Sequence, residues 1–123
     1  MPFLQLIIGG AVGTVARYGL ALGVNRAWGV GFPYGTLVVN LSGCFLVGVF
    51  ASLAEEKFVL GSNARILLMI GFCGAFTTFS TFILETSNLI RDGETLRAFM
   101  NVMLSVAVGF ILFRIGMWLG KVF

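Results

Sequence analysis

Long apolar runs separated by short polar connectors make up most of this chain. Four such runs cover about residues 3–24, 35–54, 65–90 and 98–120. A spanning helix needs about 20 mostly apolar residues, so each run is long enough to cross a bilayer. The pattern predicts an all-α membrane protein with four transmembrane helices in a single domain, residues 1–123. The third run is longer than a bilayer requires, which favours a break or a tilt in that helix.

The composition supports the membrane assignment. Hydrophobic residues make up 59% of the chain and charged residues 11%, and the mean hydropathy is +1.03. A soluble domain of this size could not bury so much apolar surface in one core. The first run is not expected to be a cleavable signal peptide, because no Lys or Arg precedes it and Arg17 interrupts it.

The residue types that most enzymatic and metal sites need are scarce. The chain has no histidine, and its two cysteines, Cys44 and Cys73, fall inside apolar runs. We expect both cysteines to act as small packing residues. Ser-His-Asp and Cys-His arrangements are excluded, and no zinc-type ligand set remains. Four of the five acidic residues lie in or beside connectors, leaving Glu85 inside a run. We therefore expect no enzyme.

The basic residues divide equally between the two sides of the membrane. If the side that holds the N-terminus is called side A, four lie in or toward side A and four toward side B: Lys57, Arg65, Arg114 and Lys121, against Arg17, Arg26, Arg91 and Arg97. The positive-inside rule then favours neither orientation. The balance predicts insertion in both orientations, and two oppositely inserted copies can form an antiparallel homodimer with an isologous interface.

Small residues recur inside the runs at helical spacing. Gly9 and Gly13 form one GxxxG pair, and Gly116 and Gly120 form another. Glycines at this spacing let helix backbones approach closely, and packing drives helix association in lipid. We therefore expect these glycines to lie at contacts between helices.

Hydroxyl and aromatic residues gather in the third run. Gly71–Phe82 contains Thr77, Thr78, Ser80 and Thr81 interleaved with four phenylalanines. Lipid offers no hydrogen bonds, so hydroxyls at this depth are expected to face protein, water or a passing solute. Aromatic rings have electropositive edges, which can approach an anion without trapping it as a full positive charge would.

Two other runs carry matching polar stripes. Thr36 and Asn40 lie one turn apart in the second run, and Asn101 and Ser105 do so in the fourth. An unbonded Asn amide is costly in lipid, so Asn40 either locks two helices together or lines a polar path. We favour the polar path, because the second, third and fourth runs each carry a stripe of polar residues that could face the same space.

Three segments together resemble one family. They are Gly9–Tyr18 (GGAVGTVARY), Gly35–Asn40 (GTLVVN) and Gly74–Phe82 (GAFTTFSTF) followed by Glu85. Each is modest alone, but in this order in a four-span chain they closely resemble the Fluc (CrcB) fluoride channels, over nearly the whole length.

The resemblance implies an antiparallel, dual-topology homodimer with two pores that export fluoride passively. It implies that Asn40, Phe79 and Phe82 line the fluoride path, helped by Thr36, Thr81 and Ser105. It also implies a structural sodium ion at the dimer centre, held by backbone carbonyls of Gly74 and Thr77 at a break near the middle of the third helix. Arg17 and Glu85 match family positions with structural or vestibule roles.

The same resemblance implies the plasma membrane of a prokaryote, the inner membrane if the cell is Gram-negative. The expected partners are fluoride, a second copy and lipid, with no nucleic acid. Family members often carry an aromatic or other polar residue near Asn101, so the fourth run departs from the pattern and the role of Asn101 stays open.

Two alternatives from other classes remain. One is a proton-coupled multidrug exporter, which needs a carboxylate within the membrane, ideally in the first span. The first run has none, and Glu85 is the one candidate. The other is a subunit that transports nothing and uses its polar residues to join helices. Fluoride efflux from liposomes separates these possibilities.

Overall fold

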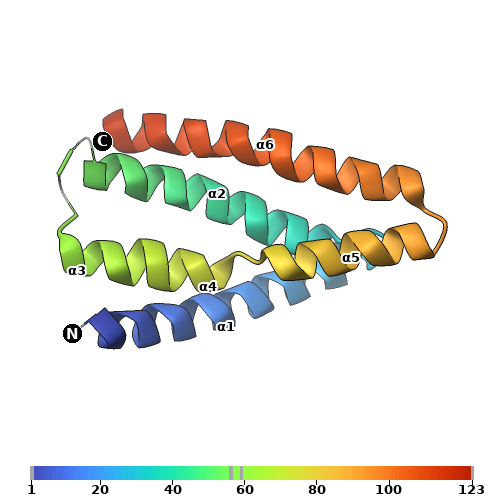
Figure 1. The fold of residues 1–123 in the computed structure, drawn as a ribbon, viewed down its shortest axis with the longest axis horizontal. Helices are drawn as coiled ribbons and strands as arrows, with labels where there is room; N and C mark the ends of the chain where they lie inside the picture. Colours follow the sequence, from blue (N-terminus) through green and yellow to red (C-terminus); the bar gives the residue numbers. More distant parts are fainter. Residues whose placement is uncertain (1, 56, 59, 123) are drawn as a thin grey trace.

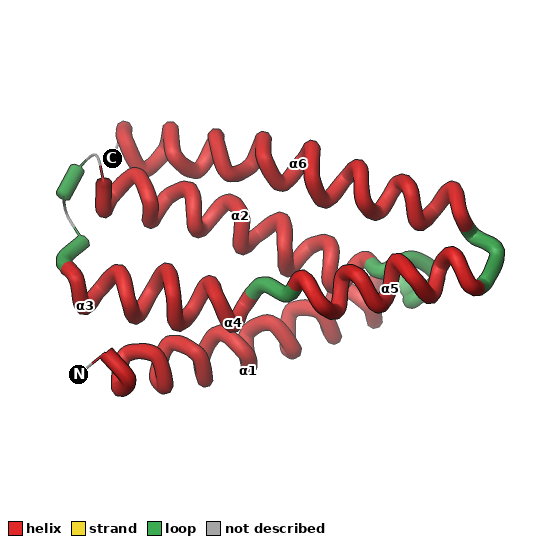
Figure 2. The backbone as a smooth tube through the Cα atoms, viewed as in Figure 1, coloured by secondary structure: helices red, strands yellow, loops and turns green. Residues whose placement is uncertain are grey.

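The fold is a bundle of long helices lying side by side (Figures 1 and 2). The computed structural model describes residues 2–55, 57–58 and 60–122. In chain order the elements are α1 (Pro2–Trp28), α2 (Tyr34–Glu55), α3 (Ser62–Arg65), the π-helix η1 (Ile66–Cys73), α4 (Gly74–Phe76), α5 (Phe79–Arg91) and α6 (Thr95–Val122).

Four helical stretches among the described residues are long and apolar enough to cross a membrane, as predicted. They are Pro2–Trp28, Tyr34–Glu55, Ser62–Arg91 and Thr95–Val122. Each extends a few residues beyond the predicted run. The apolar pattern marks only the part inside the hydrocarbon, whereas the backbone stays helical through charged end residues such as Arg26, Arg91 and Lys121.

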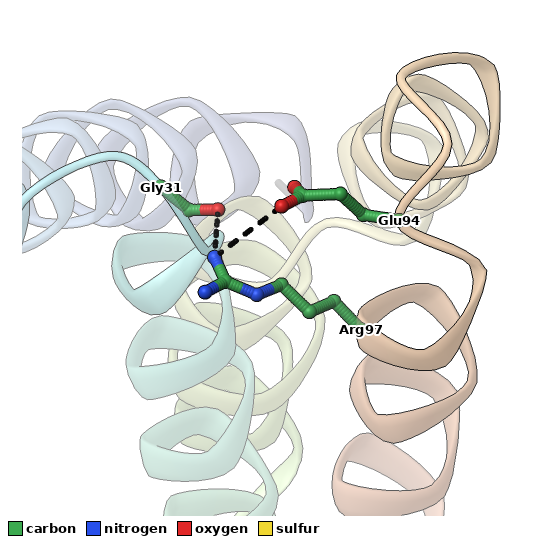
Figure 3. Close-up of polar contacts among 3 residues, drawn as sticks. All are labelled: Gly31, Glu94 and Arg97. Atoms are coloured by element: carbon green, nitrogen blue, oxygen red, sulfur yellow. Dashed lines mark hydrogen bonds and ion pairs between the residues drawn. The ribbon is translucent and has the colours of Figure 1, made fainter.

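Both described ends of the chain lie at one end of the bundle, which we call side A (Figure 1). The connectors 29–33 and 92–94 share the opposite end, side B (Figure 2). Figure 3 shows how Arg97 joins these connectors. Its Nη1 donates to the Gly31 carbonyl at 3.1 Å and lies 3.8 Å from Oε1 of Glu94. These side chains are exposed, so the ion pair adds little stability.

The third span is interrupted, as the sequence favoured. The helix runs through Phe76, and Thr77 and Thr78 then adopt extended backbone, with φ/ψ of −91/156° and −148/116°. The break begins at Thr77, at the end of the expected Gly74–Thr77 interval, and Gly74 itself is helical at −61/−38°. A glycine lowers helix stability by only about 1 kcal/mol relative to Ala, which neighbouring turns easily offset.

The first half of that span contains a feature that the sequence did not predict. Residues Ile66–Cys73 form a π-helix of eight residues. Such helices are rare and occur mostly as short bulges. Here the π-helix packs along α1.

Glycines lie at the closest helix contacts, as expected from the GxxxG pairs. A methyl group added at Gly9 would collide with the Leu67 carbonyl of η1, and one at Gly116 would collide with the Phe45 carbonyl of α2. Gly48 of α2 approaches the Phe113 carbonyl of α6 in the same way. These glycines therefore set how closely α1 packs on η1 and α2 packs on α6.

Candidate functional site

Asn40 joins α2 to the break in the third span. Its Oδ1 accepts from the Thr78 backbone N–H at 2.8 Å, and its Nδ2 donates to the Thr78 carbonyl at 3.0 Å. The amide thus satisfies both backbone groups of one extended residue at membrane depth, where water cannot. The Asn40 amide carries two Nδ2 hydrogens. One of them bonds to the Thr78 carbonyl, so one remains for a solute.

Thr78 also begins the second half-helix. Its Oγ1 accepts from the Thr81 backbone N–H at 3.3 Å, an N-cap contact, and donates to Thr81 Oγ1 at 3.0 Å. Thr81, predicted to line the path, therefore has its hydroxyl bonded to the cap and does not line the groove described below.

The break changes the hydrogen bonding of the backbone carbonyl groups before it, including those of Gly74, Ala75 and Thr77. In a continuous helix Gly74, Ala75 and Thr77 would accept from residues 78, 79 and 81. The N–H groups of Thr78 and Thr81 instead bond to Asn40 and to Thr78 Oγ1. The Ala75 carbonyl accepts from Nε of half-buried Arg17 at 3.1 Å. Arg17 therefore braces the end of α4 from α1, and the Gly74 and Thr77 carbonyls are released from helical bonding.

A groove of about 370 Å³ runs beside the break, between α2, α5 and α6. Its lining residues are Asn40, Gly43, Cys44, Val47, Thr77, Thr78, Phe79, Phe82, Ser105, Val106 and Phe113. Four of the six predicted path residues line it, namely Asn40, Phe79, Phe82 and Ser105. The lining has no charged side chain.

The two phenylalanines differ in exposure. Phe82 is 8% exposed and Phe79 is 74% exposed, and their ring centroids lie 5.8 Å apart. Phe82 is thus enclosed within the protomer, whereas most of Phe79 is exposed on the protomer surface. Phe76, the preceding member of the stripe, is buried and stacks on Phe72, so it belongs to the packing and not to the groove.

Ser105 brings an unused hydroxyl to the groove. Its Oγ is buried and has no hydrogen-bond partner in the protomer. An unbonded buried hydroxyl costs free energy, so this group is available to a solute that reaches the groove.

Thr36 and Glu85 lie outside the groove, toward side B. Thr36 is buried beside the Glu85 carboxyl, whose Oε1 is buried without a partner. Glu85 lines a separate cavity of about 340 Å³ near the connectors, together with Asn25, Asn88 and others. Thr36 therefore lies beside Glu85 and is not part of the groove wall.

Sequence reasoning did not single out several residues that structure this site. Thr78 was one hydroxyl among four, and its role as cap and Asn40 partner depends on extended backbone that sequence alone did not reveal. Cys44 was expected to pack, and it both approaches Gly109 of α6 and lines the groove. Thr86 was not considered, although it bonds to Asn101. The sequence did contain one indication that Cys44 lies near the groove, because Cys44 is four residues after Asn40 and therefore on the same helix face.

Comparison with known proteins gives a consistent result over nearly the whole chain. The family described as "CrcB-like protein, Camphor Resistance (CrcB)" matches residues 4–117. A protein of Methylocella silvestris named "Fluoride-specific ion channel FluC" is 47% identical over 99% of this chain and 92% of its own length. Proteins with the same name from Geobacter sulfurreducens (47% identical; 95% of this chain, 91% of the relative) and Chlorobaculum tepidum (49%; 92% and 89%) are similarly close.

Proposed function

The chain belongs to the CrcB-like family, and from this premise we propose that it is a fluoride-specific ion channel that releases fluoride passively from the cell. The family is one of ion channels, not enzymes, in agreement with the composition. The observation that carries the proposal is the uncharged groove, which combines the Asn40 amide, the unpaired Ser105 hydroxyl and the rings of Phe79 and Phe82. A fixed cation would hold the anion, whereas neutral donors let it pass.

The donors suit a small, strongly hydrated anion. Fluoride must exchange its water for protein donors at each step along the path. The free Nδ2 hydrogen of Asn40 and the Ser105 hydroxyl supply conventional hydrogen bonds. The ring edges of Phe79 and Phe82 supply weaker, electropositive contacts beside them. Thr36 and Glu85 follow toward side B, where they form the vestibule.

We propose that two copies assemble in antiparallel orientation and form two pores. The basic residues are balanced, and Phe79 is largely exposed in one protomer although it lies beside the groove. A second copy would cover that ring and close the groove. α1 also exposes apolar residues on the protomer surface, including Phe3, Ile7 and Val15, which lipid or a partner can cover.

A structural sodium ion at the dimer centre fits the residues present. The released carbonyls of Gly74 and Thr77 are hard oxygen donors, which suit a hard monovalent cation. The described residues contain no cluster of His, Cys, Asp or Glu that could hold a metal, and the proposed donors are backbone oxygens. We expect protein purified with N-methylglucamine in place of sodium to lose thermal stability and to recover it with sodium. Equal stability in both cations would contradict this assignment.

The two alternatives account for less of the site. A proton-coupled drug exporter needs a carboxylate in the transport path, but Glu85 lies outside the groove, near side B. Helix joining explains the Asn40–Thr78 bonds, yet it leaves the Ser105 hydroxyl and the uncharged groove without a purpose. The bacterial relatives support a location in a prokaryotic plasma membrane, with several membrane crossings.

Fluoride efflux from liposomes tests the proposal. Purified protein should release fluoride from loaded vesicles and leave chloride inside, without proton flux driven by an organic cation. Empty vesicles give the background. Equal chloride and fluoride release, or proton flux that depends on a drug, would refute a fluoride channel.

A further inference from the structure

α5 is a half-helix whose position is not set by the helix before it. The extended residues Thr77 and Thr78 separate it from α4, so no continuous hydrogen-bond ladder joins the two. Its position must come from contacts with other elements. Asn40 holds its first turn through Thr78. A second contact lies two turns further along, at Thr86.

That second contact is a chain of hydrogen bonds from α6. Asn101, only 2% exposed, donates from Nδ2 to Thr86 Oγ1 at 2.9 Å. Thr86 Oγ1 donates in turn to the Phe82 carbonyl at 2.7 Å. The Thr86 hydroxyl therefore acts as acceptor and donor at once, and such chains strengthen each member. The chain ends on the backbone of a groove-lining residue.

The same connection relates two of the helices that line the groove. Phe82 lies one turn before Thr86 on α5, and Ser105 lies one turn after Asn101 on α6. Both Phe82 and Ser105 line the groove. The Asn101–Thr86 bond thus fixes how α5 and α6 are registered at the point where the Phe82 ring and the Ser105 hydroxyl face the same space.

We propose that Asn101, acting through Thr86, is a positioning residue that sets the spacing of Phe82 and Ser105 and thereby the selectivity of the path. The inference rests on the proposed channel function. Asn101 does not line the groove, so its effect is exerted through the register of α5 against α6. Losing the connection lets α5 shift relative to α6, and a wider, less uniform spacing favours larger anions.

The test uses variants that differ in one hydroxyl. Thr86→Val keeps the shape of the side chain but removes the donor and acceptor, whereas Thr86→Ser keeps both. Ser87→Ala removes an exposed hydroxyl from the next position and serves as the control. Fluoride and chloride permeability are measured in liposomes, and assembly is checked by size exclusion. We expect Thr86→Val to lower the fluoride-to-chloride permeability ratio by about tenfold, and Thr86→Ser and Ser87→Ala to retain it.

A double-mutant comparison assigns the effect to the Asn101–Thr86 pair. Asn101→Leu should lower the ratio as Thr86→Val does, and the two together should be no worse than either alone. Additive losses would overturn the proposal. So would wild-type selectivity in Thr86→Val, equal loss in Thr86→Ser, or failure of Thr86→Val to assemble, since that last result would make the bond a requirement for folding.

A measurement independent of conduction separates this inference from the proposed function. Hydrogen exchange of the Phe79–Arg91 amides should be faster in Thr86→Val than in Thr86→Ser, because α5 loses one of the hydrogen bonds that attach it to α6. If the wild type conducts no fluoride but this difference is present, the channel function fails and the positioning role of Asn101 stands. If exchange is equal in the two variants, the positioning role fails.

Discussion

At the scale of single residues, the groove-lining side chains make different contributions to the proposed path. The Phe82 ring is buried within the protomer, the Phe79 ring is largely exposed, and the Asn40 amide already makes two hydrogen bonds to Thr78 at the break. We expect Phe79→Ile and Phe82→Ile each to reduce fluoride efflux about tenfold or more, because the aliphatic side chain lacks a ring edge. Efflux from liposomes, with size exclusion to confirm the dimer, is the measurement.

Phe76→Ile is the matched control for these variants. Phe76 belongs to the same stripe, but it stacks on Phe72 and does not line the groove. Its replacement should lower thermal stability more than efflux. If Phe76→Ile reduced efflux as strongly as the other two variants, the rings would be acting through packing.

Asn40→Asp should abolish most efflux for two reasons. The new carboxylate would place an oxygen where Nδ2 now donates to the Thr78 carbonyl, and it would put a negative charge in the anion path. We expect a loss of about tenfold or more, measured as fluoride efflux. Efflux at the wild-type level in this variant would place the path elsewhere.

The two cysteines give a chemical test of the groove. Cys44 lines it, whereas Cys73 is 1% exposed within the bundle. A small methanethiosulfonate reagent should block efflux in the Cys73→Ala variant and have no effect on Cys44→Ala. Block that survives in Cys44→Ala would show that the reagent acts at Cys73 or outside the groove.

At the scale of elements, glycine contacts determine how tightly the helices pack. Gly9 lies against the backbone of η1, while a methyl group at the neighbouring Gly10 would meet no atom of the protomer. Gly9→Ala should therefore destabilise the protein by about 1–3 kcal/mol through overpacking, and Gly10→Ala should leave the protomer fold stable. Thermal unfolding in detergent measures both, and equal destabilisation would mean that α1 and η1 do not meet at Gly9.

The elements also show which features the sequence could predict. The four spans follow directly from apolar runs, and the close contacts follow from GxxxG spacing. The break was expected from the length of the third run and placed at Gly74–Thr77, but its extension to Thr78 was not expected, because it depends on Asn40 reaching Thr78 from another helix. The π-helical first half has no pattern in Ile66–Cys73 that distinguishes it from an α-helix.

The site was predictable to a similar degree. Asn40, Phe79, Phe82 and Ser105 were identified from helical spacing and resemblance, and they meet in one groove. Thr36 and Thr81 were predicted to line the path but do not line the groove. Helical spacing shows which face of a helix a residue occupies, but it shows neither the depth of the residue in the bundle nor its hydrogen bonds to neighbours. The hydrogen bond between Asn101 and Thr86 joins two different helices. No pattern in the sequence shows that these two residues meet.

At the scale of the whole molecule, the balance of basic residues predicts insertion in both orientations. Three lysines added at the C-terminal end should bias insertion and impair function when that variant is expressed alone. Co-expression with a variant biased the other way should restore efflux. Accessibility labelling of a single introduced cysteine measures orientation, and uniform orientation of the unmodified protein would refute dual topology.

The break at Thr77–Thr78 also gives the middle of the membrane an electrical polarity. Aligned peptide dipoles leave about half a positive charge at the start of a helix and half a negative charge at its end. The first half of the span ends at Phe76 in carbonyl oxygens, and the second begins at Phe79 in amide hydrogens. Two residues of extended chain therefore separate a carbonyl end, where the Arg17 guanidinium already binds the Ala75 oxygen, from an amide end that favours anions a few residues away. An anion that reaches the groove beside the break would therefore meet the amide end of α5 as well as the neutral side-chain donors.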